Sequence, residues 1–238
     1  MWTYLAIFLS LTAILIVFVR RLVLKKRAAI EAGRPVEETP VEEPEDQEIA
    51  SKSDRAKAQA LCDQAEGFLK AGKDDEAIKC FVQALALDSL HQETQYRLAM
   101  LYLQKQMFSA AAALFEQLAL STEDPVLFSH LGLALYQQGE MVGAKGAYQK
   151  ALELDDSRPQ RFVSLAQVYK ALGQLNNAVI ALVKAIEAEE QNTDYLFLLA
   201  ELQTGLGHSE QAKEIVKRIL ELEPRNKEAK EMLKSFET

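Results

Sequence analysis

The sequence has few of the residues from which most catalytic and metal centres are built. Its 238 residues include two cysteines and three histidines. Cys62 and Cys80 do not form a CxxC pair, and no HExxH motif occurs, so the usual zinc and redox spacings are missing. The ten glycines are scattered, and none forms part of a phosphate-binding loop. We therefore expect no catalytic, metal-binding or cofactor-binding residue, and we predict that the protein is not an enzyme.

Positive charge is also scarce. Lys and Arg number 27 against 35 Asp and Glu, which gives a net charge of −8 and a pI of about 5.1. Nucleic-acid binding needs a basic stripe that neutralises phosphates, and this composition argues against it. Two acidic pairs, Asp74–Asp75 and Asp155–Asp156, are interpreted as solvated loop residues that favour helix starts rather than as calcium ligands.

A helical pattern, in contrast, is repeated five times between residues 58 and 226. The spacing is 34 residues, apart from one deletion near residues 124 and 125. Each copy has a small residue on its first helix, then a turn residue, then an alanine on its second helix. The small residues are Ala65, Ala99, Gly132, Ala166 and Ala200. The turn residues are Gly72, Gln106, Gly139, Gly173 and Gly207, and the alanines are Ala77, Ala111, Ala144, Ala178 and Ala212.

Elementary packing rules predict the fold from this pattern. Residues three and four apart share a helix face, so each copy predicts two helices with apolar stripes, and small residues let the two pack closely. Gly139, Gly173 and Gly207 suit the left-handed conformation that ends a helix, whereas Gln106 predicts looser packing in the second copy. Because one helix pair cannot bury both of its faces, the copies are expected to stack into a solenoid.

The pattern resembles the tetratricopeptide repeat (TPR). The resemblance implies an all-α fold, a right-handed superhelix of about five helix-turn-helix repeats with a capping helix at its end. The predicted domain, residues 53–238, contains repeats 58–91, 92–124, 125–158, 159–192 and 193–226 and the capping helix 227–238. Asn226 is expected to cap that last helix, which covers the exposed end of the stack. A homodimer contact is the alternative use of its Phe236.

The amino terminus has one long hydrophobic run. Residues 2–19 carry no charge and, as a helix, would rise about 27 Å, close to the roughly 30 Å of the hydrocarbon core. Residues 1–24, with a basic flank to residue 27, are therefore predicted to form a single transmembrane helix. A cleaved signal peptide would carry its positive charge before the run, and a buried core helix would not be apolar on every face. The basic residues follow the run, so the positive-inside rule predicts an outer amino terminus and a cytoplasmic repeat domain.

Residues 28–52 are predicted to be a disordered linker. Within them, residues 31–48 hold eight carboxylates, three prolines and one arginine. Such a segment cannot bury enough apolar surface to fold. We interpret it as a solvated spacer, with an acidic docking tail as the alternative.

The resemblance also implies where a partner binds. In TPR proteins the first helices line a concave groove, and the matching positions here are largely apolar and aromatic. These candidate residues are Tyr96, Met100, Leu133, Tyr136, Val163, Gln167, Lys170, Phe197 and Glu201. Such a surface suits an amphipathic helix or an extended peptide, and packing against the next repeat is the alternative for any one of them. Cys62 and Glu66 stand where some family members use Lys and Asn to hold a terminal carboxylate, so that ligand is not expected.

These features together predict a membrane-tethered TPR adaptor or scaffold that assembles a complex with a protein or peptide partner. The layout resembles bacterial inner-membrane repeat proteins with one amino-terminal span, although organelle import receptors share it. Two alternatives remain. One is a chaperone-like or secretion-linked assembly factor with its repeats on the outer face, and the other is a regulatory subunit of a membrane enzyme. No small-molecule substrate is expected.

Overall fold

The computed structural model describes residues 50–236, which contain eleven α-helices and no strand. These are α2 (Lys52–Lys70), α3 (Asp74–Leu87), α4 (Gln92–Gln104), α5 (Phe108–Thr122), α6 (Pro125–Gln138), α7 (Met141–Leu154), α8 (Pro159–Ala171), α9 (Leu175–Ala188), α10 (Thr193–Gly205), α11 (Ser209–Leu222) and α12 (Lys227–Ser235). The prediction of an all-α solenoid is confirmed.

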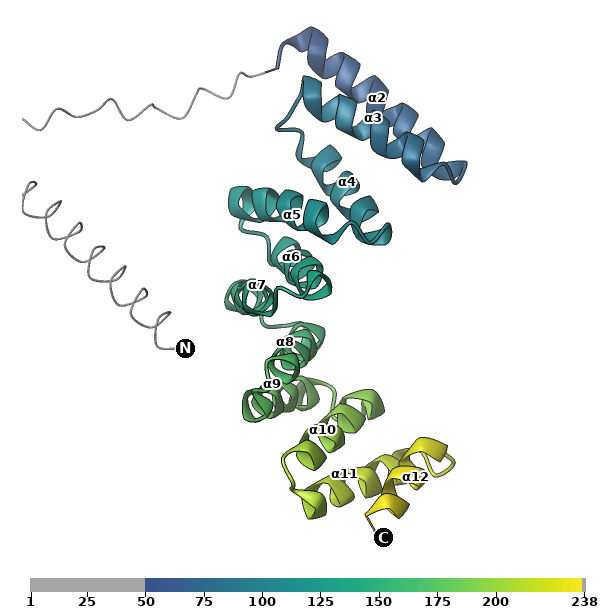
Figure 1. The fold of residues 1–238 in the computed structure, drawn as a ribbon, viewed down its shortest axis with the longest axis vertical. Helices are drawn as coiled ribbons and strands as arrows, with labels where there is room; N and C mark the ends of the chain where they lie inside the picture. Colours follow the sequence, from purple (N-terminus) through teal and green to yellow (C-terminus); the bar gives the residue numbers. More distant parts are fainter. Residues whose placement is uncertain (1–49, 237–238) are drawn as a thin grey trace, which may run out of the picture. The chain divides into compact units, whose positions relative to one another are not determined.

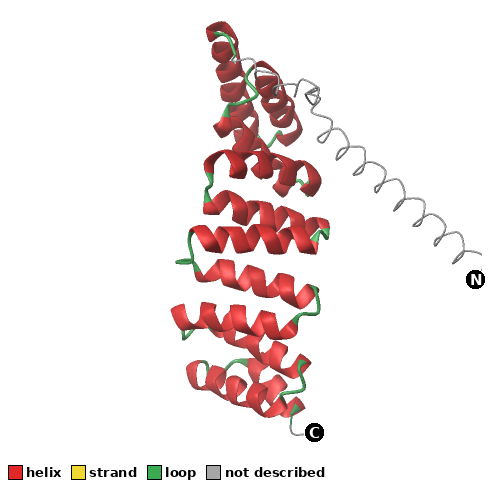
Figure 2. Cartoon of the chain, turned by 90° about the vertical axis from the view of Figure 1, so that its left-hand side faces the viewer, coloured by secondary structure: helices red, strands yellow, loops and turns green. Residues whose placement is uncertain are grey.

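The helices form pairs that stack along the described unit (Figure 1). Within each pair the chain reverses at a tight turn, so the two helices run antiparallel. The rotated view in Figure 2 separates the successive helices and the loops that join them. In the order of the chain, α2, α4, α6, α8 and α10 are the first helices of their pairs, and α12 follows the last pair.

Side-chain caps define the starts of several helices. Ser51 accepts a hydrogen bond from the Asp54 amide at 3.1 Å, so α2 begins at Lys52, one residue before the expected domain boundary. Asp124 caps α6 and is followed by Pro125, which is preorganised for the first helical position. Asn226 accepts from the Ala229 amide at 3.0 Å, which confirms its predicted role as the cap of α12.

The turn inside each pair contains one residue with positive φ. Gly139, Gly173 and Gly207 have φ of 89°, 71° and 79°, as the sequence predicts. Gln106 stands at the same place in the second pair with φ of 59°. The turn therefore keeps its shape there without a glycine, at a cost in backbone strain.

The repeated alanines lie in the core of the stack. Ala77, Ala111, Ala144, Ala178 and Ala212 are all fully buried. Large side chains fill the space beside them, and those of Phe81, Phe115 and Leu182 are fully buried. The core is thus a row of similar layers, each made by one helix pair and its neighbour.

The predicted anchor (1–24), its basic flank and residues 28–49 of the predicted linker lie outside the described residues. Across residues 50–236, no helix combines the length and the apolar character that crossing a bilayer would require.

Candidate functional site

A hollow of about 430 Å³ lies between the first helices of the third and fourth pairs. Most of its lining comes from α6 and α8, with Tyr148 from α7 and Arg158 from the residue that precedes α8. Three of the predicted groove residues, Leu133, Tyr136 and Gln167, are part of this lining. The full lining is Val126, Ser129, His130, Leu133, Tyr136, Gln137, Tyr148, Arg158, Gln160, Arg161, Ser164 and Gln167.

Arg161 is the most deeply buried charged residue of this hollow, with 5% of its surface exposed. Its Nη1 donates to the backbone oxygen of Asp155 at 2.6 Å and to the Oδ2 of the same residue at 2.5 Å. Its Nε donates to the hydroxyl of Ser129 on α6 at 3.2 Å. The guanidinium therefore joins α8 to α6 and to the loop after α7.

Asp155 lies in the loop after α7, as expected, with 33% of its side chain exposed, and it also has partners that the sequence does not indicate. Its carboxylate accepts from the Ser157 amide at 3.0 Å and from Arg161. Hydrogen bonding from the Ser157 side chain, then from Arg161 and from the Ser157 amide, holds the pKa of Asp155 well below its usual range. Asp74 and Asp75 also have a partner, since both lie within 3.6 Å of the Lys105 amine. Asp74 and Asp75 stand in the first turn of α3, as expected. Among residues 50–236 no three His, Cys, Asp or Glu side chains form a metal-binding group.

His130 borders the hollow and packs into an aromatic cluster. Its ring stacks on Phe115 with centroids 5.2 Å apart and lies 6.0 Å from the ring of Tyr96. Burial lowers the pKa of His130, against a smaller opposing effect of Asp124. The imidazole is therefore neutral at pH 7. Part of the side-chain surface of Tyr96, a predicted groove residue, is in contact with this cluster and is not available to a partner.

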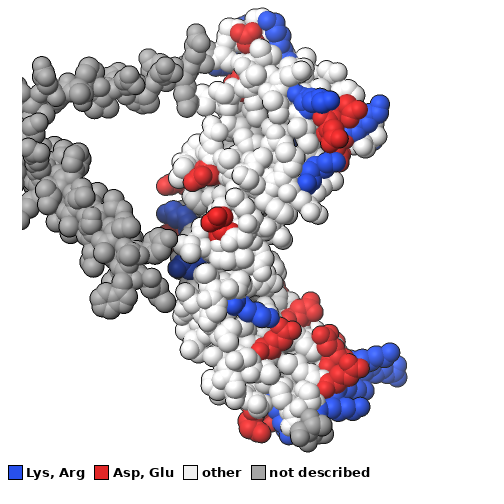
Figure 3. Space-filling view, in the orientation of Figure 1, with Lys and Arg blue, Asp and Glu red and all other residues white. Residues whose placement is uncertain are grey.

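The electrostatic character of the hollow follows from its charged lining residues. Arg158 and Arg161 line it, and no carboxylate does. Burial raises the pKa of Tyr148 to about 12, so its phenol is also uncharged at neutral pH. On the face drawn in Figure 3, acidic and basic side chains lie close together in clusters. Because Arg161 is paired with Asp155, Arg158 is the lining cation that has no ion-pair partner among the described residues.

The other predicted groove residues differ in what they offer a partner. Met100 is 37% exposed and Leu133 38%, so both present apolar surface. Lys170 and Glu201 form an exposed ion pair at 2.6 Å, and Phe197 is half-buried against the core of the last pairs. Val163 is 5% exposed and packs in that core, which removes its side chain from the accessible surface.

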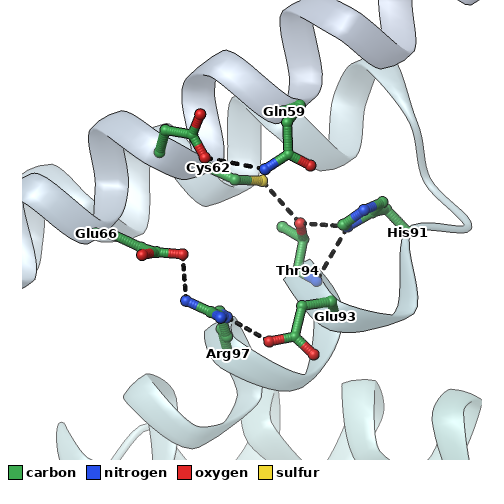
Figure 4. Close-up of polar contacts among 8 residues, drawn as sticks. Gln59, Cys62, Glu66, His91, Glu93, Thr94 and Arg97 are labelled. Carbon is green, nitrogen blue, oxygen red and sulfur yellow. Dashed lines mark hydrogen bonds and ion pairs between the residues drawn. The ribbon is translucent and has the colours of Figure 1, made fainter.

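A second polar cluster joins the first two pairs (Figure 4). The Cys62 thiol lies 2.8 Å from the Thr94 hydroxyl, which in turn lies 2.7 Å from Nδ1 of His91. Beside it, Arg97 bridges Glu66 on α2 and Glu93 on its own helix. Cys62 and Thr94 are both buried, so the contacts hold α2 against α4 and leave no thiol open to a substrate.

Sequence reasoning does not single out Arg158 or Arg161. The repeat register contains a signal that could have found Arg161. Its counterparts in the neighbouring copies are Leu127 and Tyr195, which are buried in the structure. An arginine in a register position that other copies bury is unusual and must be paired, which marks it for attention. Arg158 lies in a loop and has no such signal.

A family model described as tetratricopeptide repeat matches residues 68–129 and 171–235, together more than half of the chain. No curated protein matches the sequence.

Solved structures share the fold. MamA superposes with a TM-score of 0.67 at 21% identity over 71% of this chain and 93% of its own. YrrB, described as a TPR protein with an unusual peptide-binding site, gives 0.64 at 21% identity over 74% and 92%. The C-terminal part of a TPR repeat-containing protein from Cytophaga hutchinsonii gives 0.66 at 25% identity over 77% and 76%.

Proposed function

Since the chain belongs to the tetratricopeptide repeat family, we propose that it is a non-catalytic adaptor that holds a segment of a partner protein against its first helices. The observation that carries this proposal is the hollow between α6 and α8, to which Leu133, Tyr136 and Gln167 contribute. The YrrB structure, described as having a peptide-binding site, supports the same class of ligand here.

The size and composition of the hollow suit a side chain or two of a peptide. A volume of about 430 Å³ is in the range of ligand sites, but an open, mixed lining favours a segment that continues beyond it. Leu133 and Met100 supply exposed apolar surface on neighbouring first helices, and Tyr136 supplies an aromatic ring with a polar end. An extended or helical segment could contact all three in succession.

Paired substitutions test whether this surface binds the partner. The variant Leu133→Ala/Tyr136→Ala removes apolar area from the hollow. The control Val142→Ala/Ile180→Ala removes apolar area from second helices, where these residues are 69% and 61% exposed. We expect partners captured from native membranes to be lost with the first variant and retained with the second. Both variants should show the thermal unfolding transition of the wild type. Equal capture by both variants would contradict the proposal.

We propose further that the adaptor is tethered to a cytoplasmic membrane by residues 1–24, with its repeats inside the cell. The support is the uncharged run 2–19 and the basic residues that follow it. A tether confines the binding surface to the membrane plane and raises its effective concentration towards membrane-bound partners.

Protease treatment of intact spheroplasts tests the tether and its orientation. We expect the repeat domain to sediment with membranes, resist alkaline extraction and survive the protease until the cells are lysed. Digestion without lysis would place the repeats on the outer face, and release into the soluble fraction would contradict the anchor.

A further inference from the structure

We infer that the hollow between α6 and α8 selects a partner segment in which an acidic side chain lies next to an apolar one. The inference rests on the proposed function, because it gives the chemistry of the ligand at the same site. It is carried by the charge of the lining, by the fixed position of one arginine and by the apolar residues beside it.

The charge is distributed unevenly. Two guanidinium groups, those of Arg158 and Arg161, line the hollow without any carboxylate among the lining residues. Asp155 neutralises part of the Arg161 charge through Nη1, but it is not itself a lining residue. In a chain with eight more acidic than basic residues, this local excess repels cationic segments and attracts anionic ones.

The two arginines have different structural roles. Arg161 is held by Ser129 and Asp155, and within residues 50–236 its Nη2 donates no hydrogen bond, although every fully buried polar atom has a partner. Nη2 is therefore not fully enclosed, although only 5% of the residue is exposed. Arg158 is exposed, and no described residue forms an ion pair with it. One donor is thus preorganised and the other is free to close on a carboxylate, which charge-assisted hydrogen bonding favours.

Apolar surface adjoins the arginines. Leu133, Tyr136 and Val126 line the same hollow from α6, opposite the α8 residues. A carboxylate held by the arginines would bring the neighbouring residue of its chain onto this surface. A segment with Asp or Glu beside Leu, Val or an aromatic residue fits both parts, whereas a purely acidic segment would leave the apolar part unused.

A peptide selection tests the inference. Full-length protein in detergent is used to select binders from a random 12-residue library, displayed with a blocked carboxyl end. Selected peptides are then synthesised as carboxyl-terminal amides, so that side chains provide all their carboxylates. Dissociation constants are measured for each peptide and its Glu→Gln or Asp→Asn form at low and moderate salt.

Three protein variants accompany the wild type. Arg158→Glu reverses the exposed charge, Arg225→Glu makes the same change in the loop before α12, and Leu133→Ala/Tyr136→Ala removes the apolar surface. Arg158 is chosen over Arg161 because the latter also holds helices together. Circular dichroism confirms that each variant is folded.

We expect selected peptides to be enriched in acidic residues next to apolar ones. Neutralising the acid, or Arg158→Glu, should weaken binding about tenfold or more, since a hydrogen bond to a charged group is lost. Arg225→Glu should change it less than about twofold, and salt should weaken only the acidic form. Binders that need Leu133 and Tyr136 but are unaffected by charge changes would overturn this inference and leave the adaptor function standing. Binders insensitive to all three variants, or none at all, would overturn both.

Discussion

At the scale of single residues, the turns inside the helix pairs illustrate how closely the chain follows its pattern. Four turns use glycine at positive φ, and the second uses Gln106 at 59°. A side chain in the left-handed region crowds the backbone, and glycine avoids this. The second turn is therefore formed by the packing of α4 and α5 in spite of its local sequence.

Replacing Gln106 by glycine should stabilise the protein. We expect the free energy of unfolding to rise by about 1 kcal/mol, because strain is relieved at an exposed position where no side-chain contact is lost. Urea unfolding measures the change. The converse substitution, Gly173→Gln, is the control and should destabilise by a similar amount, and a destabilised Gln106→Gly would contradict the interpretation.

Gly132 is the small residue of the third copy, and the structure explains why it is smaller than the alanines elsewhere. A β-carbon built there would lie 2.9 Å from two ring carbons of Tyr148, whose side chain is buried. Gly132→Ala should therefore cost about 1 to 3 kcal/mol of stability through overpacking. Gly146, also helical, has no atom within 4 Å of such a carbon. Gly146→Ala should instead add about 0.5 to 1 kcal/mol by its higher helix propensity, and calorimetry of both variants tests the contrast.

His130 should make stability depend on pH. Burial lowers the pKa of His130 in the folded protein, so below the unfolded value of about 6.5 the unfolded chain binds a proton that the folded one does not. Stability is thus expected to fall as the pH drops from about 6.5 towards the folded-state pKa. His130→Phe keeps an aromatic ring beside Phe115 and Tyr96 and removes the titration. Its loss of stability between pH 7.5 and 5.5 should be smaller than that of the wild type, and an equal loss would contradict the assignment.

At the scale of helices, polar contacts recur between first helices of adjacent pairs. Arg97 on α4 reaches Glu66 on α2, Arg161 on α8 reaches Ser129 on α6, and Lys170 reaches Glu201 on α10. In each case the partners lie about one repeat apart in the sequence. These contacts join α2 to α4, α6 to α8 and α8 to α10, in addition to the packing of the buried alanines.

The last helix depends on its cap. α12 has nine residues and covers the end of the stack with Ala229, which is fully buried, and with Met232 and Leu233. Asn226→Ala should lower stability by about 1 kcal/mol and speed amide exchange in α12 before other helices. Asn176→Ala, at an exposed position of α9, is the control and should leave α12 unchanged. Faster exchange spread evenly over all helices would contradict a local role.

Local rules were enough to predict the helices, the turns and their glycines, because each depends on residues within one copy. Predicting the binding site requires the contacts between copies as well. Val163 and Leu133 both stand at expected groove positions, yet the first is buried by the neighbouring pair and the second is exposed. Arg161 on α8 is held by Ser129 on α6 and by Asp155 in the loop between α7 and α8. Such contacts between copies depend on how the pairs stack, which the spacing of residues does not specify.

At the scale of the whole molecule, a stack of similar layers leaves one row of first helices as a continuous surface. Among residues 50–236 no three His, Cys, Asp or Glu side chains form a metal-binding group, and the polar clusters described above join helices. What distinguishes one stretch of the row is the hollow at α6 and α8, with its two arginines and apolar wall. We expect this stretch to contact the partner.

Site-specific photocrosslinking in native membranes tests this expectation. A photoreactive amino acid is placed at Leu133 in the hollow or at Ile180 on α9, which is 61% exposed and belongs to a second helix. We predict a discrete crosslinked partner from position 133 and none from position 180. A partner crosslinked from position 180 and absent from position 133 would contradict the account and assign binding to the second helices.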